Sequence, residues 1–211
     1  DLRKHTVFDV RLGRSEPSLR GYLKGLEGRG NVQVVVMDLS ETYRSIAPVP
    51  VVEFHHAALD HYFISAREAD IAALDSGRHA GWRRTGATFL AWPAFVEGAA
   101  RVCRYYLPPE AGDSHFFSAS DEECRDVAER FPSFVLEDAA VMFMSLPDAM
   151  SGACPGGTVP VFRLWNARAA TNHRYTGDGG TRLAMLAAGW KSEGYGPQGV
   201  AMCSPDALAS A

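Results

Sequence analysis

The stretch VVVMDLSETYRSIAPVPVVEFHHAALDHYF, from Val34 to Phe63, changes its pattern halfway along. Its first half is a continuous apolar run that ends at Asp38 and leads into a serine-capped helix start, which is typical of a buried strand in an α/β sheet. Its second half follows the sequence PVP and contains a short apolar strand, a turn, and a histidine beside two aromatic residues, which indicates a β unit. The stretch therefore predicts two parts, residues 1–47 and 48–211.

Residues 1–47 have the strand–helix–strand–helix order of a parallel α/β sheet. HTVFDVRLG alternates apolar and polar residues, SEPSLRGYLKGL carries leucines at helical spacing, VQVVVMD is a buried-type strand, and SETYRSIA starts a second helix. These stretches resemble the catalytic core of insertion-sequence transposases with the DDE, ribonuclease-H-like fold. The resemblance implies that Asp38 matches one carboxylate of a two-metal site for phosphoryl transfer.

The transposase-like segment ends before the remaining strands and acidic partners of such a site. We therefore expect residues 1–47 to be a truncated α/β fragment rather than an active transposase. Its uncovered apolar strand is a candidate surface for self-association, because an unpaired strand edge is a template for pairing with another chain.

Residues 48–211 contain three similar stretches, at about 51–92, 101–144 and 160–203. Each opens with a short apolar strand, continues through a turn into a His-x-aromatic unit, and then has a short helical segment and a last strand. The histidines of the three units are His61, His115 and His173. A repeat of this length cannot bury its apolar face alone, so three copies must share one core. We expect a mainly β domain with short helices and a β-trefoil-like, pseudo-threefold arrangement; a small propeller-like array is the alternative.

The lines LDHYF, GDSHFFSASDEEC, GACPGGTVPVFRLWNARAATNHRYT and GW…EGYG…VAMC resemble a family of bacterial repeat domains of unknown function. Such domains occur in secreted or cell-surface proteins, and some are attached to hydrolases. The resemblance implies an architecture and an extracellular setting, but no chemistry that transfers to particular residues.

The four cysteines fall in the second half of the chain, and none forms a C-x-x-C pair, which argues against a zinc site. We expect two disulfides, in any of three pairings; four buried free thiols are the alternative in a reducing compartment. The cysteines are Cys103, Cys124, Cys154 and Cys203. The first residues lack the pattern of a signal peptide, so the actual location stays open.

The net charge of -4 and the sequence pI of about 6.0 give no electrostatic basis for binding nucleic acid or an anionic membrane. No apolar run approaches the length of about 20 residues that a membrane helix needs. These properties favour a glycan or another small molecule as the partner.

Aromatic residues near loops and strand ends are the strongest indication of function. An aromatic ring can stack on the C–H face of a sugar while nearby polar groups bind its hydroxyls. We expect most of these rings to belong to the core. The candidates for binding carbohydrate or cell-wall material are Trp92, Trp165, Tyr195 and Asn172.

The alternative function is a small hydrolase of an ester, lactone or glycoside bond. Asp60 precedes His61, Asp113 lies near His115, and His173 completes the set; a histidine oriented by a carboxylate is a common general base. Because the histidine recurs in each copy, the main interpretation is structural, with each ring bonded to a turn carbonyl. We expect no cofactor, and the only one that the sequence suggests is calcium, through Asp178 in the loop TGDGG.

Overall fold

The computed structural model describes residues 47–207. The transposase-like fragment, with Asp38 and the self-association edge, lies outside the described residues apart from its last residue. The first unit consists of β1 (Val49–His56), β2 (His61–Ser65), α3 (Glu68–Asp75) and β3 (Trp82–Ala91). The second consists of β4 (Ala100–Leu107), the short η2 (Pro109–Ala111), β5 (Ser114–Ser118), α4 (Asp121–Arg130) and β6 (Val135–Met144). The third consists of β7 (Thr158–Trp165), β8 (His173–Thr176), α5 (Gly179–Ala187), β9 (Lys191–Glu193) and β10 (Val200–Pro205).

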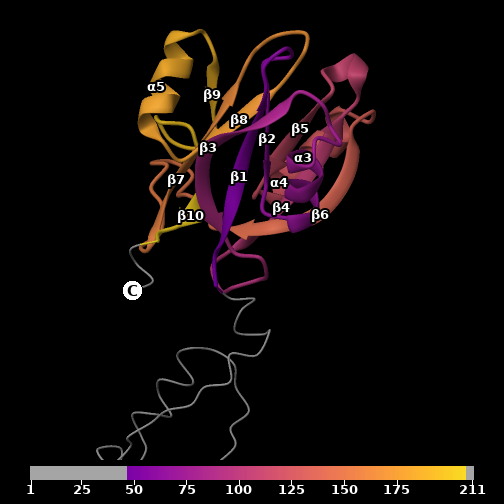
Figure 1. The fold of residues 1–211 in the computed structure, drawn as a ribbon. Coiled ribbons are helices and arrows are strands. Elements are labelled where there is room, and N and C mark those ends of the chain that lie inside the picture. The colour runs from indigo at the N-terminus through magenta and orange to yellow at the C-terminus, as the bar shows by residue number, and fades with distance from the viewer. Residues whose placement is uncertain (1–46, 208–211) are drawn as a thin grey trace, which may run out of the picture. The chain divides into compact units, whose positions relative to one another are not determined.

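The described strands form three antiparallel sheets, one per unit, and the expected mainly β class with short helices is confirmed (Figure 1). The first strand of each unit is central: β1 lies between β2 and β3, β4 between β5 and β6, and β7 between β8 and β10. Both edges of each central strand are thus used within its own unit. For this reason the described sheets do not join into the closed barrel that a β-trefoil requires.

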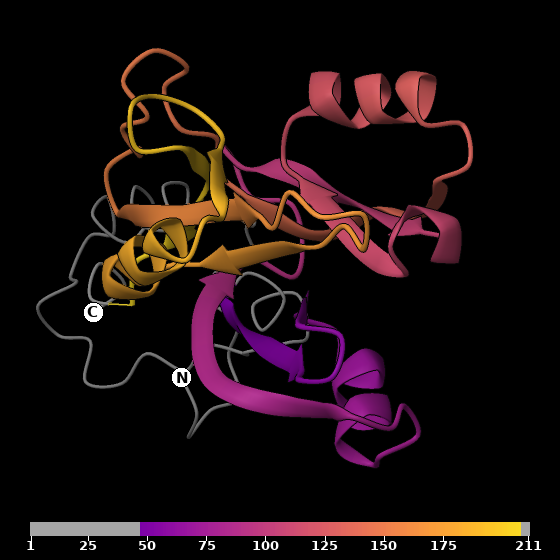
Figure 2. The ribbon, with the colours of Figure 1, turned by 90° about the horizontal axis from the view of Figure 1, so that it is seen from above.

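The three units occupy three lobes that meet at one end of their last strands (Figure 2). Isolated bridges join Trp92 to Phe143 and Ser145 to Cys203, while the Ser204 hydroxyl donates to the backbone oxygen of Leu90 at 2.8 Å. The main hydrophobic core draws on all three units. Its fully buried side chains include Phe54, Phe117, Met142, Met144 and Met202. The units therefore share one core, as the sequence predicted from their short length.

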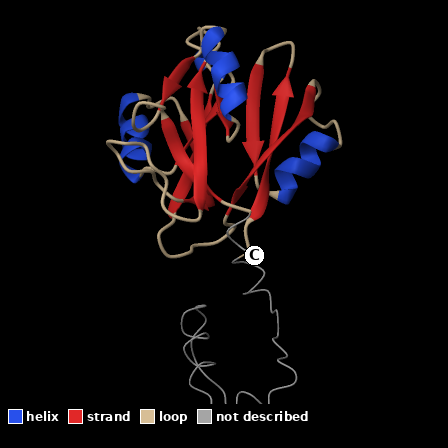
Figure 3. Cartoon of the chain, turned by 90° about the vertical axis from the view of Figure 1, so that its left-hand side faces the viewer, coloured by secondary structure: helices blue, strands red, loops and turns tan. Residues whose placement is uncertain are grey.

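The three α-helices lie around the periphery of the sheets (Figure 3). The same hydrogen bond precedes each helix: the hydroxyl of the last residue of the preceding strand accepts the backbone N–H two residues later. Ser65, Ser118 and Thr176 make this bond at 3.0, 3.0 and 3.1 Å. This bond turns the chain from strand to helix at the same point in every unit.

Strand register corrects the alignment of the histidines. Ser65, Ser118 and Thr176 hold equivalent places in the hairpins, since they pair with Val52, Cys103 and Phe162. Three residues earlier stand Tyr62, His115 and His173. His61 therefore corresponds to Ser114 and Asn172, and the first unit has tyrosine where the other two have histidine. A shift of one residue matters because it moves a strand side chain to the opposite face.

The expected disulfides are confirmed, and their pairing is Cys103–Cys124 and Cys154–Cys203. The first ties α4 to the central strand β4 within the second unit, and the second ties the loop before β7 to β10. Two disulfides indicate an oxidising, extracellular type of environment. Within residues 47–207 no helix is long and apolar enough to cross a membrane.

Candidate functional site

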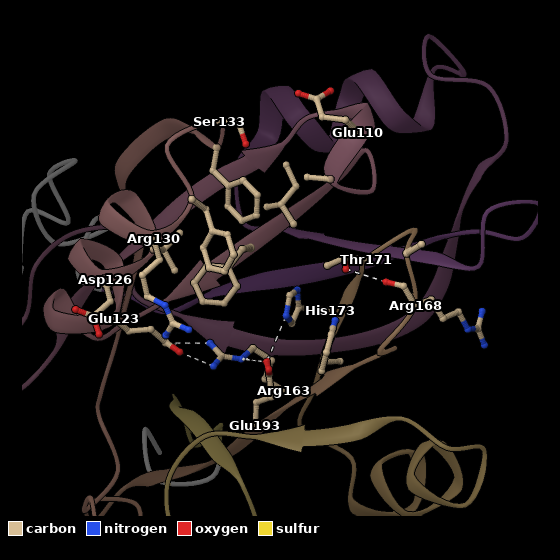
Figure 4. A pocket seen from close by; sticks show the side chains of 18 residues that line it. Glu110, Glu123, Asp126, Arg130, Ser133, Arg163, Arg168, Thr171, His173 and Glu193 are labelled. Atoms are coloured by element: carbon tan, nitrogen blue, oxygen red, sulfur yellow. Dashed lines mark hydrogen bonds and ion pairs between the residues drawn. The ribbon is translucent and has the colours of Figure 1, made fainter.

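A cavity of about 780 Å³ lies between the second and third units. The second unit supplies α4, the β4–β5 connection and the segment that leads into β6. The third unit supplies β7, the β7–β8 loop, the start of β8 and the end of β9. Figure 4 shows Glu123, Arg163, Glu193 and His173 close together in this cavity, with Glu110 and Arg168 apart from them.

Arg163 on β7 is the centre of the polar floor and is only 5% exposed. Its Nη2 and Nη1 donate to the two carboxylate oxygens of Glu123 on α4 at 2.5 and 3.0 Å, and its Nε donates to Glu193 on β9 at 3.0 Å (Figure 4). The guanidinium carbon also lies 4.7 Å from the centroid of the Phe116 ring. A buried charge is tolerated only when it is paired and hydrogen-bonded. Arg163 meets this condition by using one carboxylate from each of the two units.

His173 on β8 lines the cavity and contacts the same carboxylate, with its Nε2 at 3.3 Å from Glu193 Oε2. Burial lowers the pKa of the imidazole, and the contact with Glu193 only partly opposes this. The ring is therefore neutral at neutral pH. Nδ1 is buried and has no hydrogen-bond partner within the described residues. Most buried polar atoms are paired, so this acceptor is an unusual feature of the site.

Local sequence fixes the two carboxylates. Ser118 donates to Glu123 at 2.5 Å, and Ser120 caps α4 by accepting the Glu123 N–H at 3.2 Å, so the first turn of the helix points Glu123 at Arg163. Gly194, directly after Glu193, has a φ of 128°, and a Cβ there would lie 2.7 Å from the backbone of Val200. Only glycine fits this approach, which sets the end of β9.

The rest of the lining is apolar and rich in aromatic rings, which begin beside Arg163 and His173 at Phe116. Phe116, Phe134 and half-buried Trp165 belong to it, and the ring of Phe131 stacks on Phe134 with centroids 4.8 Å apart. Polar rim residues are Glu110, Asp126, Arg130, Arg168 and Thr171. The cavity thus combines an aromatic wall with a hydrogen-bonding floor, which suits a ligand that has both an apolar face and hydroxyl or charged groups.

A family model described as a domain of unknown function, DUF5648, matches residues 54–200, which include all three units. The chain belongs to this family. The match agrees with the expected resemblance to a family of unknown function, and it does not extend to the transposase-like residues 1–47. No curated protein and no solved structure matches the chain.

In the DUF5648 domain the side chains of the expected pairs Asp60–His61 and Asp113–His115 have other partners. His61 is 1% exposed, and its Nε2 lies 3.4 Å from the backbone oxygen of Ala170. Asp60 instead contacts His55 at 3.3 Å and Arg168 at 2.8 Å. The turn before β2 orients these side chains, and the adjacent positions 60 and 61 point to different surroundings. The carbonyl contact of His61 is of the structural kind that we expected.

In the second unit, Asp113 accepts a hydrogen bond from the hydroxyl of Tyr106 at 2.7 Å. His115 lies 3.3 Å from Glu137 on β6. In each of the second and third units the histidine is thus next to a glutamate from a later strand. In the second unit this glutamate takes the place that we expected for Asp113.

The four expected ligand-binding residues divide between cavities and framework. Trp165 lines the main cavity, and Tyr195 lines a smaller one of about 230 Å³ that shares Glu123 and Arg163 with it. Trp92 follows β3 directly, where its backbone bridges Phe143. Asn172 is 1% exposed and bonds both backbone groups of Tyr62, at 2.7 and 3.1 Å, so it joins the third unit to the first.

Asp178 is the N-cap of α5 and accepts the Thr181 N–H at 2.6 Å. Residues 47–207 contain no group of three or more His, Cys, Asp or Glu side chains placed to hold a metal ion. Gly179 and Gly180 of TGDGG are the first two residues of this helix.

Arg163 and Glu193 were absent from the sequence-based candidates. One signal was present in the DUF5648 sequence, because an arginine occurs at the same place in the apolar strands VCRYY and VFRLW. A charge repeated inside a buried-type strand indicates a paired partner.

Acidification should destabilise the domain in two steps. The pKa of His173 is lowered in the folded chain from its ordinary value of about 6.5. Below about pH 6.5 the unfolded chain therefore binds a proton that the folded chain does not, and stability falls as the pH falls. Burial raises the pKa of Glu123 and Glu193, but their contacts with Arg163, Ser118 and His173 outweigh it and keep both pKa values lowered. The two carboxylates therefore stabilise the folded state above their ordinary pKa. This stabilisation is lost at more acidic pH, as they become protonated.

Melting temperatures between about pH 8 and pH 4 measure this dependence. His173→Gln should remove the first step and keep the second. A wild-type melting temperature that stays constant between about pH 7 and pH 5 would contradict the assignment.

Proposed function

We propose that the domain is a secreted-type module that binds carbohydrate or cell-wall material in the cavity between the second and third units. The observation that carries this proposal is that one cavity is lined both by aromatic rings, with Trp165 among them, and by the polar group of Arg163, Glu123, Glu193 and His173. A sugar ring presents a C–H face that stacks on an aromatic ring and hydroxyls that both donate and accept hydrogen bonds. The carboxylates of Glu123 and Glu193, whose side chains are 36% and 30% exposed, offer acceptors for such hydroxyls.

The two disulfides support this proposal, because a domain that works outside the cell meets its glycans under oxidising conditions. We also propose that the three units are copies of one ancestral repeat. The three units share one element order, one hydroxyl hydrogen bond before each helix and one sheet pattern, which is what three copies of an ancestral unit would retain.

Replacing Trp165 by alanine should weaken polysaccharide binding at least about tenfold, since loss of a central aromatic contact commonly costs more than 1 kcal/mol. Pull-down with insoluble cellulose, chitin, xylan, mannan and peptidoglycan identifies the class, and calorimetry with the matching soluble tetrasaccharide gives the affinity. Phe95→Ala is the matched control, because Phe95 is an aromatic residue that is 68% exposed in another loop. If the wild-type domain binds none of these materials, the proposal fails.

The second candidate function is hydrolysis of an ester, lactone or glycoside bond, and one contact favours it. A neutral His173 held by Glu193 has the arrangement of a general base. Release of chromophore from nitrophenyl esters and glycosides, abolished by His173→Gln, would support hydrolysis. Activity that persists in this variant would exclude His173 as the base.

A further inference from the structure

We propose that the domain carries a second, equivalent binding site between its first and second units, whereas the interface between the third and first units is closed. This inference rests on the proposed function, because it extends the same ligand class to a second cavity. The cavity has a volume of about 480 Å³ and is lined by α3, the β4–β5 region, β3 and β6.

The floor of the second cavity has the same kinds of residue as the first, a buried arginine, two carboxylates and a histidine. Arg104 on β4 donates from Nη1 to Asp70 on α3 at 2.6 Å, and its Nε lies 2.7 Å from Glu137 on β6. One difference is that Arg104 Nε is buried without a hydrogen-bond partner in the described residues, whereas Arg163 Nε donates to Glu193. His115 Nε2 lies 3.3 Å from the same Glu137 oxygen, the distance that separates His173 from Glu193. Arg104 is 9% exposed, so this arginine is also buried among carboxylates from two units.

Strand register shows that these residues are true counterparts. Arg104 pairs with Phe117 in β5, as Arg163 pairs with Tyr175 in β8. Asp70 and Glu123 are both the third residue of their helices. The two floors are therefore the same arrangement built from different units, and not a chance similarity of side chains.

The aromatic wall is present in the second cavity as well. Tyr106 pairs with His115 in the hairpin, just as Trp165 pairs with His173. Trp82 and Phe63 also line the cavity. The Tyr106 hydroxyl donates to Asp113 at 2.7 Å, which fixes the ring at the rim and raises its pKa to about 12. The second cavity is smaller, but it offers the same combination of rings and charged groups.

The third interface replaces this set with another. Glu53 stands where the other units have arginine, Tyr62 stands where they have histidine, and Arg174 takes the place of a phenylalanine. Arg174 donates to Glu53 at 2.8 and 2.9 Å and lies 4.2 Å from the centroid of the Tyr62 ring. His55 stacks on Tyr62 at 4.4 Å, so rings and the guanidinium fill this space.

The third interface shows that the units can be joined without the Arg–Glu–His set. Here glutamate (Glu53) replaces the arginine and arginine (Arg174) replaces the phenylalanine. The two form a buried ion pair that holds the third unit to the first. If these arginine, glutamate and histidine residues served only to join units, there would be no reason for a cavity to lie beside them. Both cavities lie at the interfaces that retain them, which points to a ligand.

Tryptophan signals can report each interface separately, because the chain has four tryptophans and three of them lie at different interfaces. Trp165 lines the first cavity and Trp82 the second, while Trp190 contacts Tyr62 at the third interface with ring centroids 5.9 Å apart. The experiment is an indole ¹H–¹⁵N titration of the full chain, with peaks assigned by Trp→Phe variants. The probes are chitotetraose, cellotetraose, xylotetraose and mannotetraose.

We expect one tetrasaccharide to shift the Trp165 and Trp82 signals and to leave Trp190 unchanged, with calorimetry giving two molecules bound per chain. Tyr106→Ala should abolish the Trp82 shift and keep that of Trp165, and Trp165→Ala should retain the Trp82 shift. Ala73→Trp, which fills the second cavity from α3 without removing a contact, should act like Tyr106→Ala.

The outcomes separate the two proposals. A shift of Trp165 alone would overturn the second site and leave the proposed function intact. No shift at either residue with any probe would overturn both. A shift of Trp190 that survives Tyr106→Ala and Ala73→Trp would overturn the closed third interface.

Discussion

Arg163→Met should destabilise the domain by about 3 kcal/mol, because it leaves two carboxylates without their common partner. Glu123 and Glu193 would then face each other with side-chain exposures of only 36% and 30%. Their partial exposure places the expected loss at the lower end of the range for a broken buried pair. Urea denaturation of the oxidised protein measures this loss as a change in the free energy of unfolding.

Two further variants make this expectation specific. Arg101→Met removes an exposed arginine that pairs with Asp121, with side-chain exposures of 56% and 59%, and should change stability little. Adding Glu123→Gln and Glu193→Gln to Arg163→Met should restore part of the stability, since amides tolerate burial better than unpaired charges. If the triple variant is less stable than Arg163→Met alone, the loss comes from packing against Phe116 rather than from unpaired charge.

Removing the Cys154–Cys203 disulfide by the double change Cys154→Ala and Cys203→Ala should cost about 4 kcal/mol. The two cysteines are 49 residues apart, and a crosslink restricts the unfolded chain more when it closes a longer loop. This disulfide holds the segment before β7 to β10, whose Cys203 also bridges Ser145 of the second unit. Thermal and urea unfolding of the variant measure the cost.

The other disulfide provides the matched comparison. Cys103 and Cys124 are 21 residues apart, so the corresponding double alanine variant should lose about 3 kcal/mol. A larger loss from the shorter loop would show that native packing around Cys103, which is 3% exposed, outweighs restriction of the unfolded chain. Both losses should disappear when variant and wild type are compared under reducing conditions.

The histidine pattern shows how far local sequence can mislead. The His-x-aromatic unit occurs in all three stretches, so the sequence alone aligns His61 with His115 and His173. Strand pairing gives a different alignment, in which Tyr62 is the counterpart of the other two histidines. The first unit is therefore the divergent one, and its Glu53 and Tyr62 both contact Arg174 at its interface with the third unit.

Local patterns were enough to predict the element order, the mainly β class and the participation of all four cysteines in disulfides. These features depend on neighbouring residues, such as apolar periodicity and the hydroxyls that start each helix. Only the tertiary structure determined that three separate sheets form in place of a trefoil barrel, and that Arg163 joins Glu123 to Glu193. The Arg163–Glu123 contact spans 40 positions between the third and second units, and the Arg163–Glu193 contact spans 30 positions within the third unit. Both depend on which strand edges and helix faces meet when the chain packs.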